Sequence, residues 1–134
     1  MRYFASTPNS IWATKVNFVD DNNVLVGYDF AGSCCEQFGW YIHDKVTNNG
    51  EDPVFSDGLD GNALNEFLKE WTFDTSFFQQ LEEGEPGDVR AIAVFCLVNG
   101  DNKLFLHLYN EHNGYYSHGF DFSKDGQIIH TGSL

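Results

Sequence analysis

The alternation of apolar and polar residues predicts β-strands along most of the chain. Residues 12–19 and 24–30 are rich in aromatic and β-branched side chains, and the Asp-Asp-Asn-Asn sequence at 20–23 favours a turn between them. A hairpin is therefore expected here. Residues 37–43 read as a third strand, and the polar stretch 44–60 reads as a surface loop with a short extended piece near Val54 and Phe55.

The C-terminal third carries the strongest strand pattern. Residues 91–98 are almost continuously apolar, as in a central strand covered on both faces. Further strands are expected at 103–110, 115–122 and 127–131, because the intervening Asn-Gly and Asp-Gly pairs supply the positive φ angles of tight hairpin turns. These four strands are predicted to form one meander. The acidic Gly- and Pro-containing segment 82–88 is predicted to be a loop.

One segment has the period of a helix. Leu64, Phe67, Leu68 and Trp71 follow the i, i+3, i+4, i+7 spacing of an apolar stripe, with Asp60 as a natural N-cap. The spacing predicts a helix of roughly ten residues that lies over a sheet face. Its polar positions are expected to face outward, namely Asn62, Asn65, Glu66 and Lys69.

These elements predict an α+β fold that is mainly β: an antiparallel sheet or roll with the C-terminal meander and one short amphipathic helix. A β-sandwich is the alternative. The 134 residues fit a single domain, 1–134, with one core. Because 16% of the residues are aromatic, thirteen of them Phe, the core should be rich in rings.

The charge limits the partners. Twenty acidic and seven basic side chains give a formal net charge of −13, and the basic residues are scattered singly. Such a chain is repelled by phosphate backbones and anionic membrane surfaces, so neither direct nucleic-acid binding nor membrane binding is expected. The acidity serves solubility, or it forms a surface that binds a basic protein partner, for example by imitating nucleic acid.

The location of the protein is expected to be cytoplasmic. The chain contains no apolar run of about 20 residues, and its first residues lack the apolar core of a signal peptide. Three cysteines, two of them adjacent, do not indicate a disulfide framework.

Two histidines and two tyrosines form the first candidate site. Strand alternation places His107 and Tyr109 on one face of their strand, while Leu104, Leu106 and Leu108 on the other face are candidates for the core. Pairing across the Asn113-Gly114 turn would set His118 opposite Tyr109 or His107, depending on the turn length. The face would then hold Phe105, His107, Tyr109, Tyr116, His118, Phe120 and Phe122.

This face could form a ligand pocket, a proton-transfer site or part of a metal site. Zinc needs three or four ligands, and the strands supply only the two histidines. The alternative is that both histidines are half-buried and hydrogen-bonded to the sheet or to tyrosine hydroxyls. No metal or other cofactor is therefore predicted.

The sequence Cys34-Cys35-Glu36 is the second candidate. Adjacent strand residues point to opposite faces, so the two thiols are not expected to share a metal. A nucleophilic Cys–His pair would require His43 or His118 nearby in space, and no oxyanion-hole motif accompanies it. The alternative is one cysteine in the core and one at a sheet edge. No catalytic residue is predicted.

Three motifs resemble those of a small family of uncharacterised bacterial and phage proteins. They are Cys34-Cys35-Glu36, Trp71-Thr72-Phe73 and the Asn-Gly-Tyr-Tyr-Ser sequence at 113–117, and the resemblance extends over about residues 16–122. Members often carry Arg-Trp-Tyr-Gly where this chain has His107-Leu108-Tyr109-Asn110, so that arginine has no counterpart here. The resemblance implies the extent of the domain and carries no activity with it.

Two functional hypotheses follow. The first is a non-enzymatic protein-binding accessory module, associated with phage or mobile elements, that engages its partner through acidic loops or a free sheet edge. The alternative is a small enzyme or ligand-binding protein that combines the His/Tyr face with Cys34, Cys35 and Glu36. A free sheet edge would also allow a homodimer.

Overall fold

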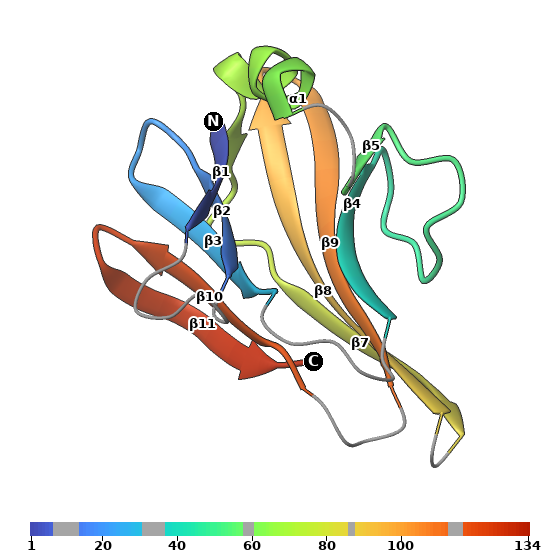
Figure 1. The fold of residues 1–134 in the computed structure, drawn as a ribbon. Helices are drawn as coiled ribbons and strands as arrows, with labels where there is room; N and C mark the ends of the chain where they lie inside the picture. Colours follow the sequence, from blue (N-terminus) through green and yellow to red (C-terminus); the bar gives the residue numbers. More distant parts are fainter. Residues whose placement is uncertain (7–13, 31–36, 58–60, 86–87, 113–116) are drawn as a thin grey trace.

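The structure, a computed structural model, describes residues 1–6, 14–30, 37–57, 61–85, 88–112 and 117–134 (Figure 1). Its strands form two antiparallel sheets. The five-stranded sheet has the order β1-β2-β3-β10-β11, with β1 Arg2–Ser6, β2 Lys15–Val19, β3 Val24–Asp29, β10 Gly119–Lys124 and β11 Gln127–Ser133. The six-stranded sheet has the order β5-β4-β9-β8-β6, with β7 also paired to β8; its strands are β4 Gln37–His43, β5 Phe55–Ser56, β6 Thr72–Phe73, β7 Gln79–Glu85, β8 Asp88–Asn99 and β9 Asn102–His112.

The mainly β, antiparallel character predicted from the sequence is confirmed, but the four-stranded meander is wrong. Strand β9 lies between β4 and β8, whereas β10 lies between β3 and β11, so β9 and β10 belong to different sheets. The last four strands are two hairpins, one in each sheet. Turn chemistry determines which strands form a hairpin, but whether two hairpins share a sheet depends on where their apolar faces find cover.

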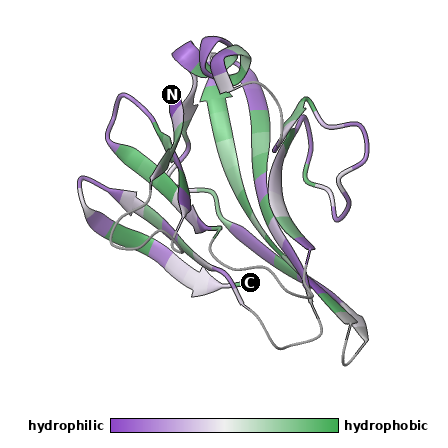
Figure 2. Ribbon diagram, in the orientation of Figure 1, coloured by the Kyte–Doolittle hydropathy of each residue, from purple (hydrophilic) through white to green (hydrophobic). Residues whose placement is uncertain are grey.

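The apolar faces cover each other across the space between the sheets. Phe18 of β2 meets Trp40 of β4 with ring centroids 5.2 Å apart, and Phe95 of β8 meets Phe122 of β10 at 5.1 Å. Figure 2 shows the hydrophobic residues concentrated along strands such as β8. The arrangement is thus the β-sandwich that the sequence offered as its alternative. The leucines of β9 lie in this core as expected, namely Leu104, Leu106 and Leu108.

Two strands differ from the sequence expectation. β7 continues to Glu85, through much of the segment 82–88 that was predicted to be a loop. Its backbone pairs with the free edge of β8, and the side chains of Glu82 and Glu83 are exposed, where edge strands tolerate charge. Strand β1 was not predicted at all. It is an edge strand, and the Asn65 side chain hydrogen-bonds to both the N–H (2.7 Å) and the carbonyl (3.1 Å) of its Tyr3.

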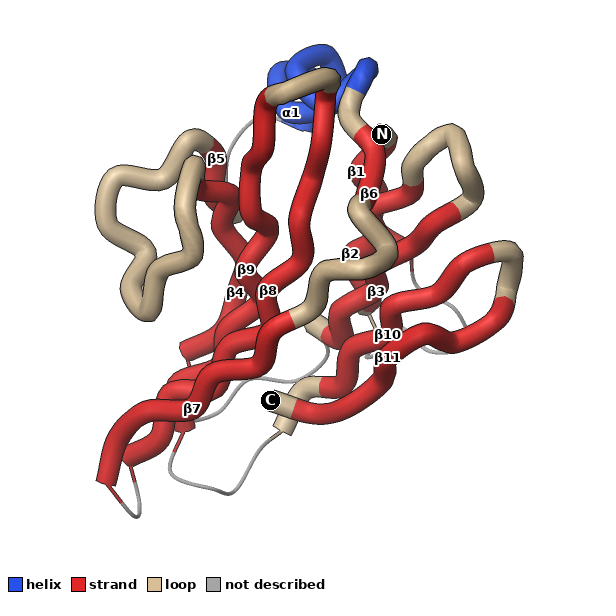
Figure 3. The backbone as a smooth tube through the Cα atoms, turned by 180° about the vertical axis from the view of Figure 1, so that it is seen from behind, coloured by secondary structure: helices blue, strands red, loops and turns tan. Residues whose placement is uncertain are grey.

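The helix closes one end of the sandwich (Figures 1 and 3). It consists of α1, Gly61–Phe67, and a 3₁₀ turn, η1, Leu68–Glu70. Leu64, Leu68 and Trp71 are buried as predicted, but Phe67 is 41% exposed and packs against the ring of Phe55. Asn65 faces β1 rather than solvent, which corrects its predicted outward position. Asp60, the expected N-cap, lies outside the described residues.

No described helix is long and apolar enough to cross a membrane.

A buried aspartate ties the β2–β3 turn to the other sheet. The Asp20 carboxylate accepts hydrogen bonds from the backbone N–H groups of Asn22 and Val24, each at 2.9 Å, and of Phe73 in β6 at 2.8 Å. A buried carboxylate is tolerated when several N–H donors replace its water. Asp20 therefore fixes the turn and joins the two sheets at this end.

Candidate binding sites

The structure separates the histidines that were expected to share a face. His107 and Tyr109 lie on the outer face of the six-stranded sheet, because the leucines that alternate with them point into the core. His118 precedes β10 and packs between the sheets. The shared-face prediction is therefore wrong for His118. The other four candidates, Tyr116, Cys34, Cys35 and Glu36, lie outside the described residues.

His118 is held in the interior. Its ring stacks on Phe38 of β4 with a centroid distance of 4.0 Å, and its Nδ1 lies 2.8 Å from the carbonyl oxygen of Asp29. Phe38 lies on the inner face of β4, because its neighbour Gly39 lies on the outer face and its partner in β9 is the buried Asn110. His118 thus contributes to packing where the two sheets meet.

His107 is fully buried and uses both ring nitrogens. Its Nδ1 lies 3.0 Å from the carbonyl oxygen of Phe105, while Nε2 accepts a hydrogen bond of 3.0 Å from the backbone N–H of Thr47. These partners require Nδ1 to carry the proton and the ring to be neutral. Burial lowers the pKa of His107 to about 4, so the ring stays neutral at physiological pH. This is the hydrogen-bonded alternative that we set against a catalytic or metal-binding histidine.

His107 anchors the loop between β4 and β5 on the outer face of the sheet. The Tyr41 ring stacks on His107 at 4.3 Å, and the Tyr41 hydroxyl lies 3.0 Å from Thr47 Oγ1. Asn48 in the same loop donates to Glu83 of β7 at 2.7 Å. The loop is therefore attached to β4, β9 and β7, and it forms one wall of a pocket.

This polar pocket has a volume of about 310 Å³. Two of its lining groups approach Gly39 of β4: a Cβ built there would come within 3 Å of both the Asp57 carboxylate and the Tyr109 hydroxyl. The missing side chain is what lets these two groups meet above the strand. The lining residues are Gln37, Trp40, Tyr41, Gly50, Pro53, Ser56, Asp57, Arg90, Tyr109 and Glu111.

Of the two carboxylates in the pocket, Glu111 has a cationic partner and Asp57 has none in the part of the chain that the structure describes. Arg90 pairs with Glu111 at 3.0 Å, and its guanidinium lies 5.2 Å from the centroid of the Tyr109 ring. Among the described residues, no lysine or arginine nitrogen lies within 4 Å of the Asp57 carboxylate. Burial raises the pKa of Asp57, and burial together with nearby Asp57 raises that of Tyr109. The pocket therefore contains a partly desolvated carboxylate that has no cationic partner among the described residues.

Only part of this pocket could be found in the sequence. Glu111 continues the alternation of His107 and Tyr109, so it belongs to the same strand face. The isolated Gly39 inside an apolar strand is a known sign of close approach by another group. Nothing local indicates Asp57 or Arg90, which reach the pocket from a loop and from another strand.

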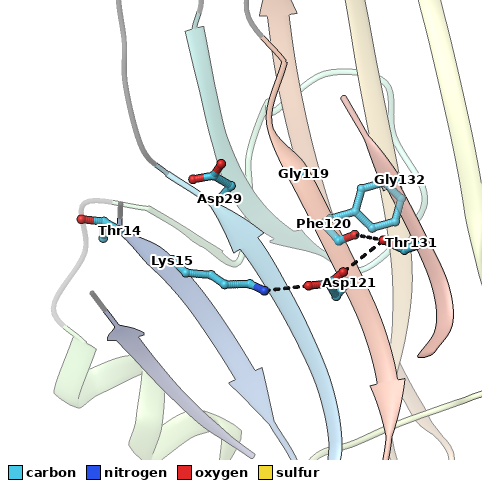
Figure 4. Close-up of a pocket in the computed structure, with 8 residues that line it drawn as sticks. All are labelled: Thr14, Lys15, Asp29, Gly119, Phe120, Asp121, Thr131 and Gly132. Carbon is cyan, nitrogen blue, oxygen red and sulfur yellow. Dashed lines mark hydrogen bonds and ion pairs between the residues drawn. The ribbon is translucent and has the colours of Figure 1, made fainter. Parts of the chain in front are cut away.

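A second depression of about 300 Å³ lies on the outer face of the five-stranded sheet (Figure 4). Lys15 of β2 reaches across Gly27 of β3 to pair with Asp121 of β10 at 2.6 Å, and Thr131 of β11 donates to the same carboxylate at 3.0 Å. The partners hold the pKa of Asp121 below its usual range. Because this cation and this carboxylate satisfy each other, the depression is a weaker candidate than the polar pocket.

The third candidate is an arm formed by the far ends of β7, β8 and β9. Figure 1 shows these strands running beyond the rest of the sandwich. Glu82 and Glu83 of β7 are exposed, and within the described chain β7 pairs with β8 alone, so its other edge is open. Arg90 and Glu111 connect the arm to the polar pocket, since both line it. We call this region the acidic arm.

Over the described ranges, no group of three or more His, Cys, Asp or Glu side chains is placed to hold a metal ion.

Comparison with protein-family models finds no match for this chain, and comparisons with curated proteins and with solved structures find no similar protein. The resemblance to the family with the Cys-Cys-Glu and Asn-Gly-Tyr-Tyr-Ser motifs therefore stays a prediction.

Proposed function

We propose that this protein is a binding module for a basic protein partner and that the acidic arm is its docking element. The observation that carries the proposal is the edge of β7, which is seven residues long, open within the described chain and bordered by exposed Glu82 and Glu83. An extended segment of a partner can add to such an edge through main-chain hydrogen bonds. Basic side chains on that segment would face the glutamates.

The other sheet edges are less suited to a partner strand. On β1, the Asn65 side chain already bonds both backbone groups of Tyr3. Strands β5 and β6 have only two residues each. On β11, a register shift leaves Ile129 without a partner in the pairing with β10, and such bulges disrupt strand addition. The long edge of β7 remains.

Charge favours a basic partner over a second copy of this chain. Two copies of net charge −13 repel each other, and the repulsion is strongest where acidic side chains protrude. A basic segment would instead be attracted to the arm, and the attraction would raise the association rate.

The enzyme alternative has less support among the described residues. His107 has both ring nitrogens occupied, and His118 lies on the other side of the sheet.

The proposal can be tested by capture of partners from the cells that produce the protein. The double variant Glu82→Lys, Glu83→Lys reverses the charge of the arm. We expect the wild type to retain a basic protein at low salt, with binding falling as ionic strength rises, and the variant to lose that protein.

The matched control is the double variant Asp21→Lys, Asp101→Lys, which makes the same change in net charge at two exposed positions outside the arm. It should retain the partner. Equal loss in both variants, or a partner retained unchanged in high salt, would contradict docking at the acidic arm.

A further inference from the structure

The polar pocket holds an incomplete set of charges. Two carboxylates, Asp57 and Glu111, line it together with a single described cation, Arg90, whose guanidinium is committed to Glu111 at 3.0 Å. The pocket therefore has one negative charge in excess. Asp57 is half-buried, so water compensates it only partly.

Arg90 shows how this environment holds a guanidinium. It combines a carboxylate partner, Glu111, with a position over the face of the Tyr109 ring, 5.2 Å from its centroid. Both contacts are favourable for a planar cation. Asp57 and the half-buried Tyr109 ring offer a second cation the same two kinds of contact, whereas Tyr41 lines the pocket with a buried ring that is stacked on His107.

Other ligands fit less well. An anion would meet Asp57 and Glu111 and would have to compete with Glu111 for Arg90. A metal ion would find two carboxylates here, and no metal-competent group of three ligands exists among the described residues. An organic cation satisfies Asp57 without displacing any contact that is already made.

We propose that the polar pocket binds a guanidinium or primary ammonium group through Asp57, with the Tyr109 ring beside it. The group comes from a free small molecule or from an arginine or lysine side chain of a partner. In the second case the inference rests on the proposed function, because the pocket adjoins the acidic arm and would receive a side chain of the docked segment.

The experiment is an NMR titration of the ¹⁵N-labelled protein with L-argininamide, followed at the backbone amides of Gly39, Asp57 and Tyr109. L-citrullinamide is the matched probe, because it replaces the guanidinium by a neutral urea of the same shape. We expect argininamide to bind roughly tenfold or more tightly than citrullinamide, as for a charge-assisted contact. Equal effects of the two probes would overturn the proposal.

Variants locate the site. Asp57→Asn keeps the shape of the side chain and removes its charge, and should weaken argininamide binding by roughly tenfold or more. The control Glu51→Gln removes an exposed charge from the neighbouring loop and should leave binding almost unchanged. Unchanged binding by Asp57→Asn, with the spectrum of a folded protein, would refute the role of Asp57.

A peptide containing one arginine between glycines separates the two sources. If it binds much more tightly than argininamide, and the Glu82→Lys variant, which keeps the Asn48–Glu83 hydrogen bond, removes that advantage, the ligand is a partner side chain. If both probes bind equally, the pocket recognises the free cation. If argininamide does not bind but partner capture depends on the acidic arm, only the proposal for the polar pocket is rejected. If argininamide binds but no arm-dependent capture is seen, only the proposal for the acidic arm is rejected.

Discussion

Acidification should weaken the fold through His107, and the effect can be calculated. The pKa of histidine is about 6.5 in an unfolded chain, and that of His107 is lowered to about 4 in the folded protein. The folded-state pKa of this base is the lower one, so between these values the unfolded state binds more protons. The stability contributed by the neutral ring is therefore complete above about pH 6.5 and is lost as the pH falls toward 4.

The magnitude follows from the two pKa values. Below both pKa values, the difference between them corresponds to a loss of about 3 kcal/mol in the free energy of unfolding. At pH 5, about 2 kcal/mol of this has already been lost relative to pH 7. The structural cause is specific. A proton on Nε2 would face the N–H of Thr47, which now donates to that atom, and would break the anchor of the β4–β5 loop.

Urea denaturation at pH 7 and pH 5 measures the effect. Other groups also titrate in this range, so the decisive quantity is the difference between wild type and His107→Gln, whose amide oxygen can accept from Thr47 but cannot be protonated. The variant should be the less stable protein at pH 7, and the gap should shrink by about 2 kcal/mol at pH 5. His130→Gln, at an exposed histidine, is the control. Parallel pH dependences of wild type and His107→Gln would refute the argument.

Three further predictions concern stability and the pocket. Asp20→Ala should lower the free energy of unfolding by about 3 kcal/mol or more, measured by urea denaturation, because it orphans three backbone N–H groups, whereas exposed Asp21→Ala should change it by less than about 0.5 kcal/mol. Leu68→Ala should cost about 2–5 kcal/mol in the same assay and Phe67→Ala clearly less, since Leu68 is fully buried and Phe67 is not; equal costs would contradict the observed orientation of the helix. Gly39→Ala should displace Asp57 and Tyr109 and abolish argininamide shifts, while Gly61→Ala, which meets nothing within 4 Å, should preserve them.

Local patterns in the sequence were sufficient for the helix and for most of the strands, because their causes are local, but they missed β1 and the end of β7. The alternation in β9 correctly assigned Leu104, Leu106 and Leu108 to the core, and the stripe of Leu64, Leu68 and Trp71 correctly oriented the helix. Phe67 fits the stripe equally well but lies at its margin. Periodicity shows which face of a helix is apolar, but it does not show how much of that face the rest of the protein covers.

The long-range arrangement could not be predicted in the same way. A two-residue turn predicts a hairpin, yet the distribution of hairpins between two sheets depends on which apolar faces pack together, and many sheet orders satisfy one strand pattern. The error at His118 followed from this: once β10 was assumed to pair with β9, its histidine was placed beside His107. The structure puts β4 beside β9 instead, and Gly39 then becomes the neighbour of Tyr109.

The pocket and its supporting histidine also change how the acidity of this protein is understood. Most exposed carboxylates are solvated and carry little information about a ligand. Asp57 differs, since the protein holds it half-buried over Gly39 while the only described cation in the pocket pairs with Glu111. The wall of that pocket is in turn fixed by His107, which has no direct place in it. The histidine and tyrosine that share one candidate face in the sequence thus have different tasks: His107 holds the loop, and Tyr109 lines the space that the loop encloses. A binding function requires both, because a desolvated carboxylate selects a cation only while the wall that excludes water stays in position.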